Sequence, residues 1–429
     1  MVMAYTAADE AENKDELETA VAGFEALGDY SDAPARLVSV QEKIRARDYA
    51  AAVTALNDED YSKAVTMFGA LGDYQDSAGL LLQAQTGVKY QTAVTDALAG
   101  RLSQAYNEFA ALGDYKDSAK KAEICGNLSR ASKTQQIAEG VLIYDFHDLW
   151  GIANLNTNVI TAAKYTSIKY ENETQYQSRN LLKVYIKGTD KFHDTYGYMD
   201  MNGKEVISCT YLGISDFNQD GLCTVAKADK YGSTYYYGAL GIADYTGKIL
   251  STPQWKEMGE SKSQKESRVG RWSSYDLKIT APIFVDGRMK VQNTDDQWGF
   301  INEKGQVLGS VKWYSIGDFS DGMAMVCETS KIKSGYYSYS TKTAYKYGFI
   351  NEQGQTIGEV RWDAVNAFSN GLAAVQENGY WGFINKNNEL VIPCQYTEVS
   401  SFKADGTCDV KTKSGTWQVI NTSGEVTFF

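Results

Sequence analysis

The sequence predicts an α+β multidomain protein, with a helical repeat domain over residues 1–138 and an all-β repeat domain over residues 139–429. Two internal repeats of different kinds and a change in composition near residue 140 support this division. Residues 1–140 hold 22 acidic and 13 basic side chains, whereas all 8 tryptophans lie at or beyond position 150. The length of 429 residues also favours more than one domain.

The first repeat combines an alanine, a phenylalanine four residues later and then Leu-Gly-Asp-Tyr-x-Asp. Alanine and phenylalanine at this spacing share one face of a helix. The glycine suits the left-handed position that ends a helix, and we expect the last aspartate to accept backbone N–H bonds as the N-cap of the next helix. The pattern lies in residues 20–37, 64–81 and 105–122, and its N-cap aspartates are Asp32, Asp76 and Asp117. The motif therefore predicts helical hairpins stacked into an α-solenoid.

These hairpins resemble degenerate tetratricopeptide repeats, of the Leu-Gly-Asp-Tyr-x-Asp-Ser variety found in Gram-positive bacterial proteins. The resemblance covers about residues 15–138. It implies a surface that recognises another protein.

The second repeat begins with an aromatic or leucine residue followed by glycine. A turn residue follows seven positions later, and an aromatic residue eight positions after that. Asn or Asp lies three residues before the turn residue, which is typical of a type I turn between antiparallel strands. The units start at Trp150, Tyr196, Leu240, Trp298, Tyr347, Trp381 and Trp417, and their turn residues are Thr157, Gly203, Gly247, Gly305, Gly354, Asn388 and Gly424. Thr157 departs from the glycine rule, and Gln418 replaces the glycine of the seventh unit.

This pattern predicts a β-propeller-like array of small sheets. We expect the glycine beside each aromatic to let a neighbouring ring lie across bare backbone. The segment Gly140–Phe146 is expected to pair with the unfinished hairpin Thr416–Phe429 and so close a ring, which would remove exposed edges. An open β-solenoid is the alternative.

The β units resemble the bacterial WG repeat family. Residues 381–396, Trp-Gly-Phe-Ile-Asn-Lys-Asn-Asn-Glu-Leu-Val-Ile-Pro-Cys-Gln-Tyr, match its consensus most closely. The resemblance covers about 280 residues and implies a β-rich repeat with a binding role.

Composition and motifs predict no catalytic residue, no metal site and no cofactor. The net charge of −12 argues against nucleic-acid binding, and the absence of a long apolar run argues against membrane insertion by this chain. Residues Asp216–Gly221 begin like a calcium loop, but Lys227 stands where the loop needs glutamate, so a repeat turn is favoured. His147 and His193 lack the partners of a catalytic or zinc motif, and the six cysteines are expected to be buried thiols in preference to disulfides.

Long insertions before the aromatic–glycine strands carry the candidate binding residues. Tyrosine offers a large contact area with a polar group, as binding surfaces require. The candidates are Tyr231, Tyr235, Tyr236, Tyr237, Tyr336, Tyr337, Tyr339 and Tyr345. The competing interpretation is that these insertions are solvated two-stranded extensions, chosen for their β-propensity.

The sequence therefore favours a non-enzymatic bacterial binding protein that recognises a protein partner. Resemblance to repeat proteins of the cell envelope implies a cell-surface or extracellular location, although no signal peptide or anchor is visible in this chain. The alternatives are glycan or cell-wall binding through the Tyr/Trp-rich insertions and, less favoured, an enzyme.

Overall fold

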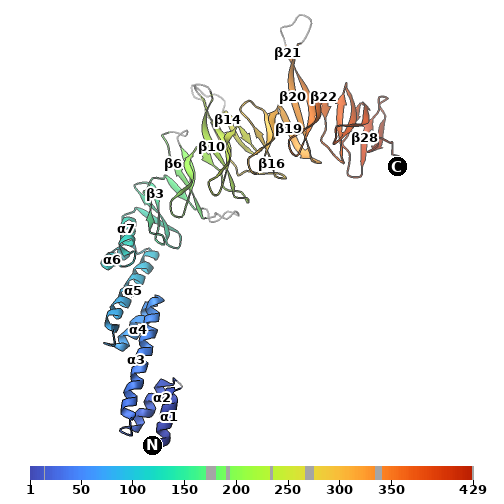
Figure 1. Ribbon diagram of the computed structural model, residues 1–429. Helices are drawn as coiled ribbons and strands as arrows, with labels where there is room; N and C mark the ends of the chain where they lie inside the picture. Colours follow the sequence, from blue (N-terminus) through green and yellow to red (C-terminus); the bar gives the residue numbers. More distant parts are fainter. Residues whose placement is uncertain are drawn as a thin grey trace. The chain divides into compact units, whose positions relative to one another are not determined.

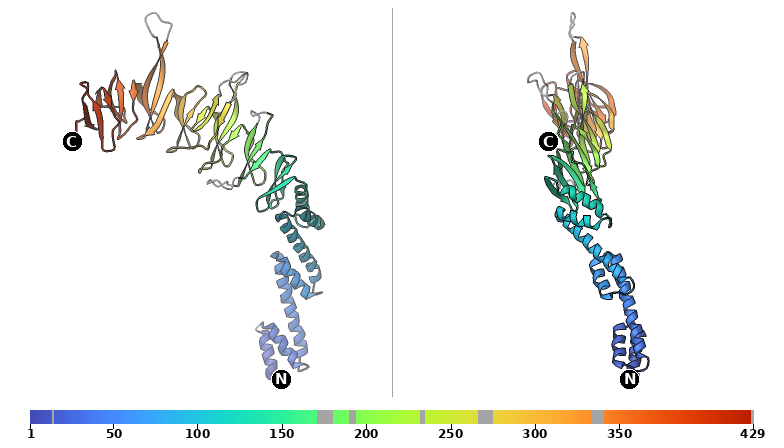
Figure 2. Two further views of the ribbon diagram at one scale, coloured as in Figure 1. Left: turned by 180° about the vertical axis from the view of Figure 1, so that it is seen from behind. Right: turned by 90° about the vertical axis from the view of Figure 1, so that its left-hand side faces the viewer.

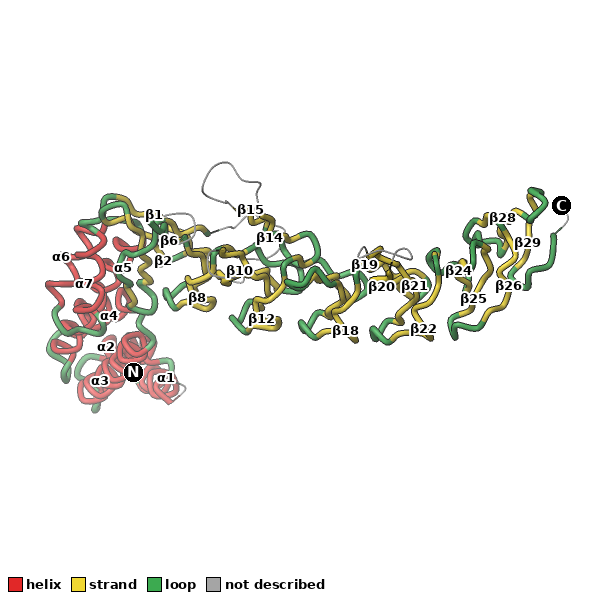
Figure 3. The backbone as a smooth tube through the Cα atoms, turned by 90° about the horizontal axis from the view of Figure 1, so that it is seen from above, coloured by secondary structure: helices red, strands yellow, loops and turns green. Residues whose placement is uncertain are grey.

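The computed structural model describes residues 1–429 except 14, 171–179, 190–193, 232–234, 266–274, 334–340 and 428–429. The chain divides into two compact units, Met1–Ala163 and Lys164–Phe429. Helices fill the N-terminal part and small antiparallel sheets follow (Figure 1; Figure 3). The change from helix to strand lies between Leu128 and Lys133, and the predicted domain boundary at 138/139 stays a prediction.

Consecutive helices of the first unit pack against each other. Those in the described residues are α1 (Val2–Asn13), α2 (Leu17–Leu27), α3 (Ala33–Asn57), α4 (Tyr61–Leu71), α5 (Ser77–Leu98), α6 (Leu102–Leu112) and α7 (Ser118–Leu128). The motif phenylalanines Phe24, Phe68 and Phe109 are at most 1% exposed. Gly28 follows α2 with a φ of 57°, which explains why glycine ends the helix.

The motif aspartates do not work as expected. Asp32, Asp76 and Asp117 do occupy the N-cap positions of α3, α5 and α7, but none of their carboxylates accepts a capping bond from the helix. Each accepts a hydrogen bond from a tyrosine hydroxyl 27 residues earlier in the chain. The expected capping bond is therefore wrong, and the aspartate instead ties two helices together.

The first sheet belongs to the helical unit. Its strands are β1 (Lys133–Ala138), β2 (Val141–Phe146), β3 (Leu149–Asn154) and β4 (Val159–Ile160). Leu142 and Leu155 share one apolar core with Phe109 and Leu128 of the helices. Lys121 of α7, 7% exposed, donates to the carbonyl of Leu155 and, at 3.0 Å, to Asn158 Oδ1.

Strand β2 has no free edge for the predicted pairing with residues 416–429. Strand β2 pairs with β1 along one edge and with β3 along the other. Both of its hydrogen-bonding edges are thus occupied, so the expected pairing with residues 416–429 is wrong.

The second unit contains six further sheets among its described residues, all antiparallel and arranged in chain order (Figure 2). The strands of the first three are β5 (Ser167–Lys169), β6 (Leu181–Ile186), β7 (Thr195–Asp200) and β8 (Glu205–Tyr211); β9 (Gly213–Ile214), β10 (Leu222–Tyr231), β11 (Tyr235–Asp244) and β12 (Ile249–Trp255); and β13 (Glu257–Met258), β14 (Ser261–Lys265), β15 (Tyr275–Lys278), β16 (Arg288–Gln292), β17 (Trp298–Asn302) and β18 (Val307–Trp313). The other three contain β19 (Ser315–Ser320), β20 (Met323–Lys333), β21 (Thr341–Asn351) and β22 (Thr356–Trp362); β23 (Ala364–Val365), β24 (Leu372–Glu377), β25 (Tyr380–Asn385) and β26 (Leu390–Tyr396); and β27 (Glu398–Val399), β28 (Thr407–Lys411) and β29 (Trp417–Asn421).

The 7-and-8 spacing is explained by strand pairing. The six later turn residues have φ between 63° and 87°, and their N–H groups bond the Asn or Asp carbonyl three residues earlier at 2.9–3.0 Å. The strand that follows brings the second aromatic opposite the first, as in Trp298↔Trp313 and Trp381↔Tyr396. In the first β repeat, which starts at Trp150, the positive φ falls on Asn158, at 57°, one residue after Thr157.

The glycine of the aromatic–glycine pair is required by a close approach of backbone. A Cβ on Gly382 would lie 2.4 Å from the carbonyl oxygen of Ile392, and one on Gly241 would lie 2.5 Å from that of Ser251. The register of these strand pairs shifts at the glycine, so a bulge presses against it. The expected aromatic ring is found at Gly151 of the first repeat, where Tyr144 Cζ would lie 2.6 Å from a Cβ, whereas the atoms nearest the other repeat glycines that the structure describes belong to backbone or to valine side chains.

Aromatic pairs join successive sheets of the second unit. In each pair, the residue after the repeat glycine contacts a phenylalanine of the segment that forms the next sheet, with ring centroids 4.7–4.9 Å apart. Phe319 lies on β19, and the other three phenylalanines lie in the connection between the first two strands of that sheet. The pairs are Tyr198–Phe217, Phe300–Phe319, Phe349–Phe368 and Phe383–Phe402. The repeat pattern therefore encodes the packing between sheets as well as the strands within them.

Candidate functional site

Two long hairpins extend beyond their sheets. Strands β20 and β21 pair from Met323↔Asn351 to Lys333↔Thr341, whereas their neighbours reach only Cys327 and Tyr347. Residues 328–333 and 341–346 thus form a two-stranded ribbon, seen at β21 in Figure 1. Within the described ranges, no further strand pairs with either ribbon edge. We call these residues the β20–β21 ribbon.

Strands β10 and β11 form a similar extension. They pair from Leu222↔Asp244 to Tyr231↔Tyr235, while the adjoining strands stop at Ala226 and Leu240. The predicted residues Tyr231, Tyr235, Tyr236 and Tyr237 belong to this extension by register, and their side chains lie outside the described part. Tyr336, Tyr337 and Tyr339 lie outside the described residues altogether.

Tyr345 is the one predicted residue whose side chain can be placed. It lies on β21 at the root of the β20–β21 ribbon and is 43% exposed. Its ring contacts Tyr314, which is 54% exposed, with ring centroids 5.3 Å apart. A hydrogen bond with Tyr314 raises the pKa of Tyr345 above its ordinary value.

The predictions missed Tyr314 because it lies outside the insertions. It directly follows Trp313, and the equivalent positions in other units hold Leu212, Lys256, Asp363 and Thr397. An aromatic residue at a position that is otherwise mostly polar was the available signal. The structure brings Tyr314 and Tyr345 together because Tyr314 begins the turn into β19, which pairs with β20.

Two ion pairs involve residues close to the two tyrosines in the chain. Lys312 lies 2.7 Å from Glu328, and Lys346 lies 2.7 Å from Asp363. Glu328 and Lys346 are themselves cross-strand neighbours in the ribbon. Because successive side chains of a strand point to opposite faces, Glu328 and Lys346 lie on the face opposite Tyr345, and the exposed aromatic pair is uncharged. Exposed tyrosines are typical of protein-binding surfaces.

Other candidate chemistry gains no site in the described residues. Asn218 closes a turn in which Gly221 has a φ of 76°, and Asp216 pairs with Lys183 at 2.9 Å, so this segment is a repeat turn as predicted. The six cysteines are free, and burial raises the pKa of Cys209 and Cys408. Among the residues that the structure places, no group of His, Cys, Asp or Glu could hold a metal ion.

No helix in the described part of the chain has the length and apolarity needed to cross a membrane.

The solved structures that match this chain are distant. The β-propeller domain of the Trilobed protease from Pyrococcus furiosus, described as having an open velcro topology, is 12% identical, with a TM-score of 0.22; the match covers 69% of this chain and 96% of that one. The tricorn protease is 10% identical over 68% of this chain, with a TM-score of 0.17, and Porphyromonas gingivalis dipeptidyl peptidase 4 is 9% identical over 61%, with a TM-score of 0.20. The chain spans only 39% and 46% of those two proteins.

No curated protein matches the chain by sequence. The model of the WG containing repeat matches residues 196–231, 298–331, 347–381 and 381–417. Each match starts at an aromatic–glycine pair identified above. Four repeats of the WG family therefore lie in the second unit.

Proposed function

We propose that this protein is a non-enzymatic binding protein that recognises a protein partner through the β20–β21 ribbon and the Tyr314–Tyr345 pair. The contact between these two exposed tyrosines carries the proposal. Paired tyrosines present a rigid apolar area with hydroxyl groups at its edge, and such residues dominate the energy of protein interfaces.

The ribbon supports the same function by a second route. Its edges present backbone N–H and C=O groups beyond the neighbouring strands. An extended segment of a partner can pair with such an edge, which supplies affinity through main-chain hydrogen bonds. The tyrosines at the root would then select the side chains of the partner.

We further propose a tetratricopeptide-like solenoid for the helices, an open array for the sheets of the second unit, and a location at the bacterial cell surface. Repeated tyrosine–aspartate bonds support the first, and sheets joined in chain order by phenylalanine contacts support the second. The location rests on the resemblance to envelope proteins. The glycan alternative for the insertions stays a prediction.

Site-specific photo-crosslinking tests the function. A photoreactive amino acid is placed at position 345 in the full chain, and at position 245 as the control, because Tyr245 is similarly exposed, at 39%. The proposal expects one protein to be crosslinked from position 345 and not from position 245. Equal crosslinking from both positions would contradict it.

A further inference from the structure

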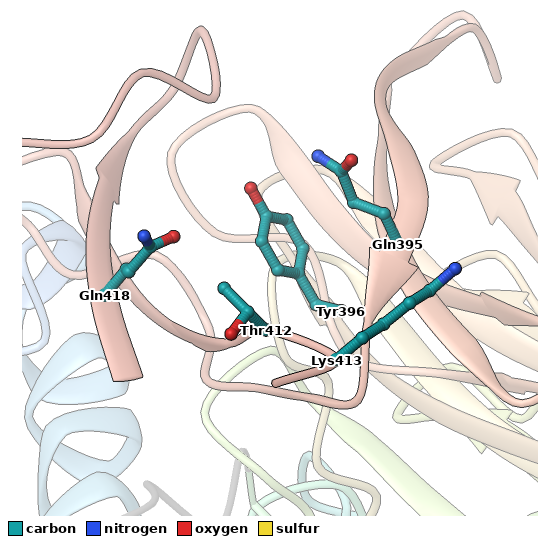
Figure 4. A pocket seen from close by; sticks show the side chains of 5 residues that line it. All are labelled: Gln395, Tyr396, Thr412, Lys413 and Gln418. Atoms are coloured by element: carbon teal, nitrogen blue, oxygen red, sulfur yellow. The ribbon is translucent and has the colours of Figure 1, made fainter. Parts of the chain in front are cut away.

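A polar hollow of about 330 Å³ lies in the second unit between β26 and the hairpin of β28 and β29. Figure 4 shows the Tyr396 hydroxyl directed into it between the carboxamides of Gln395 and Gln418. The lining residues are Gln395, Tyr396, Thr412, Lys413 and Gln418. This volume is within the range of small-molecule sites.

Tyr396 presents its hydroxyl to the hollow. The residue is only 5% exposed, and its hydroxyl is directed into the hollow. At the equivalent position of the first repeat, the Tyr165 hydroxyl donates to Glu205 Oε1 at 2.8 Å. The Tyr396 ring is buried and its hydroxyl lies at the wall of the hollow, where a ligand can replace water as its hydrogen-bond partner.

Two other repeats cover the equivalent aromatic ring with a cation that the hollow lacks. Lys312 lies over the Trp313 ring at 4.3 Å and pairs with Glu328, 16 residues later. Arg361 lies over the Trp362 ring at 3.9 Å and pairs with Glu377 at the same spacing. The sixth β repeat, which starts at Trp381, has Gln395 in place of the cation.

The acid partner has changed as well. Lys411 stands 16 residues after Gln395, where the other two units have glutamate, and it pairs with Glu398 instead. The cation and the acid that would cover the ring are thus both replaced. Gln418, which replaces the repeat glycine of the seventh unit, adds a second carboxamide to the wall.

The lining chemistry selects the ligand class. Carboxamides and hydroxyls each donate and accept hydrogen bonds, which matches the hydroxyl groups of a sugar. No carboxylate lines the hollow, and the Lys413 ammonium lies over the Tyr380 ring at 4.2 Å. A peptide would instead be held through backbone groups at a strand edge. We infer that this hollow is a subsite for one neutral sugar residue of a glycan, independent of the proposed protein-binding surface.

Saturation-transfer NMR on the full chain tests this assignment. The probes are methyl β-D-glucopyranoside, methyl β-D-galactopyranoside, methyl α-D-mannopyranoside and N-acetyl-D-glucosamine. At least one should bind, and Tyr396→Phe should weaken it about 2- to 10-fold, because one neutral hydrogen bond is lost. Gln395→Arg should abolish binding by placing a guanidinium over the ring.

Matched variants at equivalent positions of other units separate this effect from general damage. Tyr211→Phe and Gln254→Arg make the same changes in the second and third β repeats and should leave sugar binding unchanged. Near-ultraviolet circular dichroism reports that each variant keeps its fold. Failure of all four sugars to bind, or equal binding by wild type, Tyr396→Phe and Gln395→Arg, would overturn the subsite.

Discussion

The Tyr90 hydroxyl donates a hydrogen bond of 2.6 Å to Asp117 Oδ1, 27 residues later in the chain. The same bond joins Tyr49 to Asp76 and Tyr5 to Asp32, each at 2.5 Å. The Tyr90 ring also contacts Phe109 and Tyr115 edge-on. The final aspartate of the Leu-Gly-Asp-Tyr-x-Asp motif is therefore a tertiary contact that holds neighbouring helices in register.

Loss of one such hydroxyl should weaken the helical unit. Tyr90→Phe keeps the ring but removes a hydrogen bond to a carboxylate, and we expect the free energy of unfolding to fall by about 1–2 kcal/mol. The measurement is urea denaturation followed by circular dichroism at 222 nm. Tyr106→Phe is the control, because Tyr106 is 43% exposed. Equal midpoints for both variants would contradict the expected role of the Tyr90 hydroxyl.

The same contact makes the helical unit sensitive to acid. Burial raises the pKa of Asp117, but hydrogen bonds from Tyr90 and Asn158 and the charge of Lys121 outweigh it, so the pKa lies below its ordinary value. A carboxyl with a lowered folded-state pKa adds stability above its unfolded-state pKa of about 4, and that stability is lost as the pH falls through the folded-state value.

Asp117→Asn should therefore remove part of this pH dependence. Between pH 7 and pH 3, the melting temperature of the helices should fall less in Asp117→Asn than in wild type. Asp114→Asn, which changes an exposed carboxylate of the same motif, should follow wild type. If Asp117→Asn follows the wild-type curve, the paired carboxylate is not a source of the acid sensitivity.

Equivalent tryptophans should differ in the worth of their indole N–H groups. Trp255 Nε1 donates to Ser251 Oγ at 2.9 Å, whereas the buried Nε1 atoms of Trp313 and Trp362 find no partner among the described residues. The position of Ser251 is taken in those units by Gly309 and Gly358. Trp255→Phe should cost about 1 kcal/mol more than Trp313→Phe, measured as the shift of the thermal midpoint of the β sheets. Equal shifts of the thermal midpoint would show that the hydrogen bond from Trp255 to Ser251 adds no stability.

The first sheet should be needed for a stable helical unit. A fragment of residues 1–163 keeps Leu142 and Leu155 in the core of the last helices, together with the partners of Lys121. A fragment of residues 1–138 exposes that core. We expect the longer fragment to unfold cooperatively at a higher temperature in calorimetry. Identical transitions would place the boundary at the sequence-based position of 138/139.

Sequence spacing was sufficient where the interaction is local. The 7-and-8 pattern located turns such as Asn302–Gly305 and Asn385–Asn388 because an Asx residue and a left-handed residue are both fixed within four positions. It also predicted the opposed aromatics Trp381 and Tyr396. The prediction of Thr157 as the turn residue was wrong, because the first turn places its left-handed residue at Asn158.

Tertiary partners could not be read from the pattern. The repeat glycines looked like platforms for rings, but the partner of Gly382 is the Ile392 carbonyl of a bulge, and a bulge depends on strand register. The partner of Asp117 is likewise a residue of another helix. Tyr314 was missed for the same reason, since only the pairing of β19 with β20 places it beside Tyr345.

The affinity of the purified crosslinked partner for the full chain tests the proposed binding surface most directly. Isothermal titration would compare wild type with Tyr314→Ala/Tyr345→Ala and with Tyr245→Ala. The account predicts at least about 10-fold weaker binding for the double variant and unchanged binding for Tyr245→Ala. Wild-type affinity in the double variant would contradict a protein-binding role for the Tyr314–Tyr345 pair.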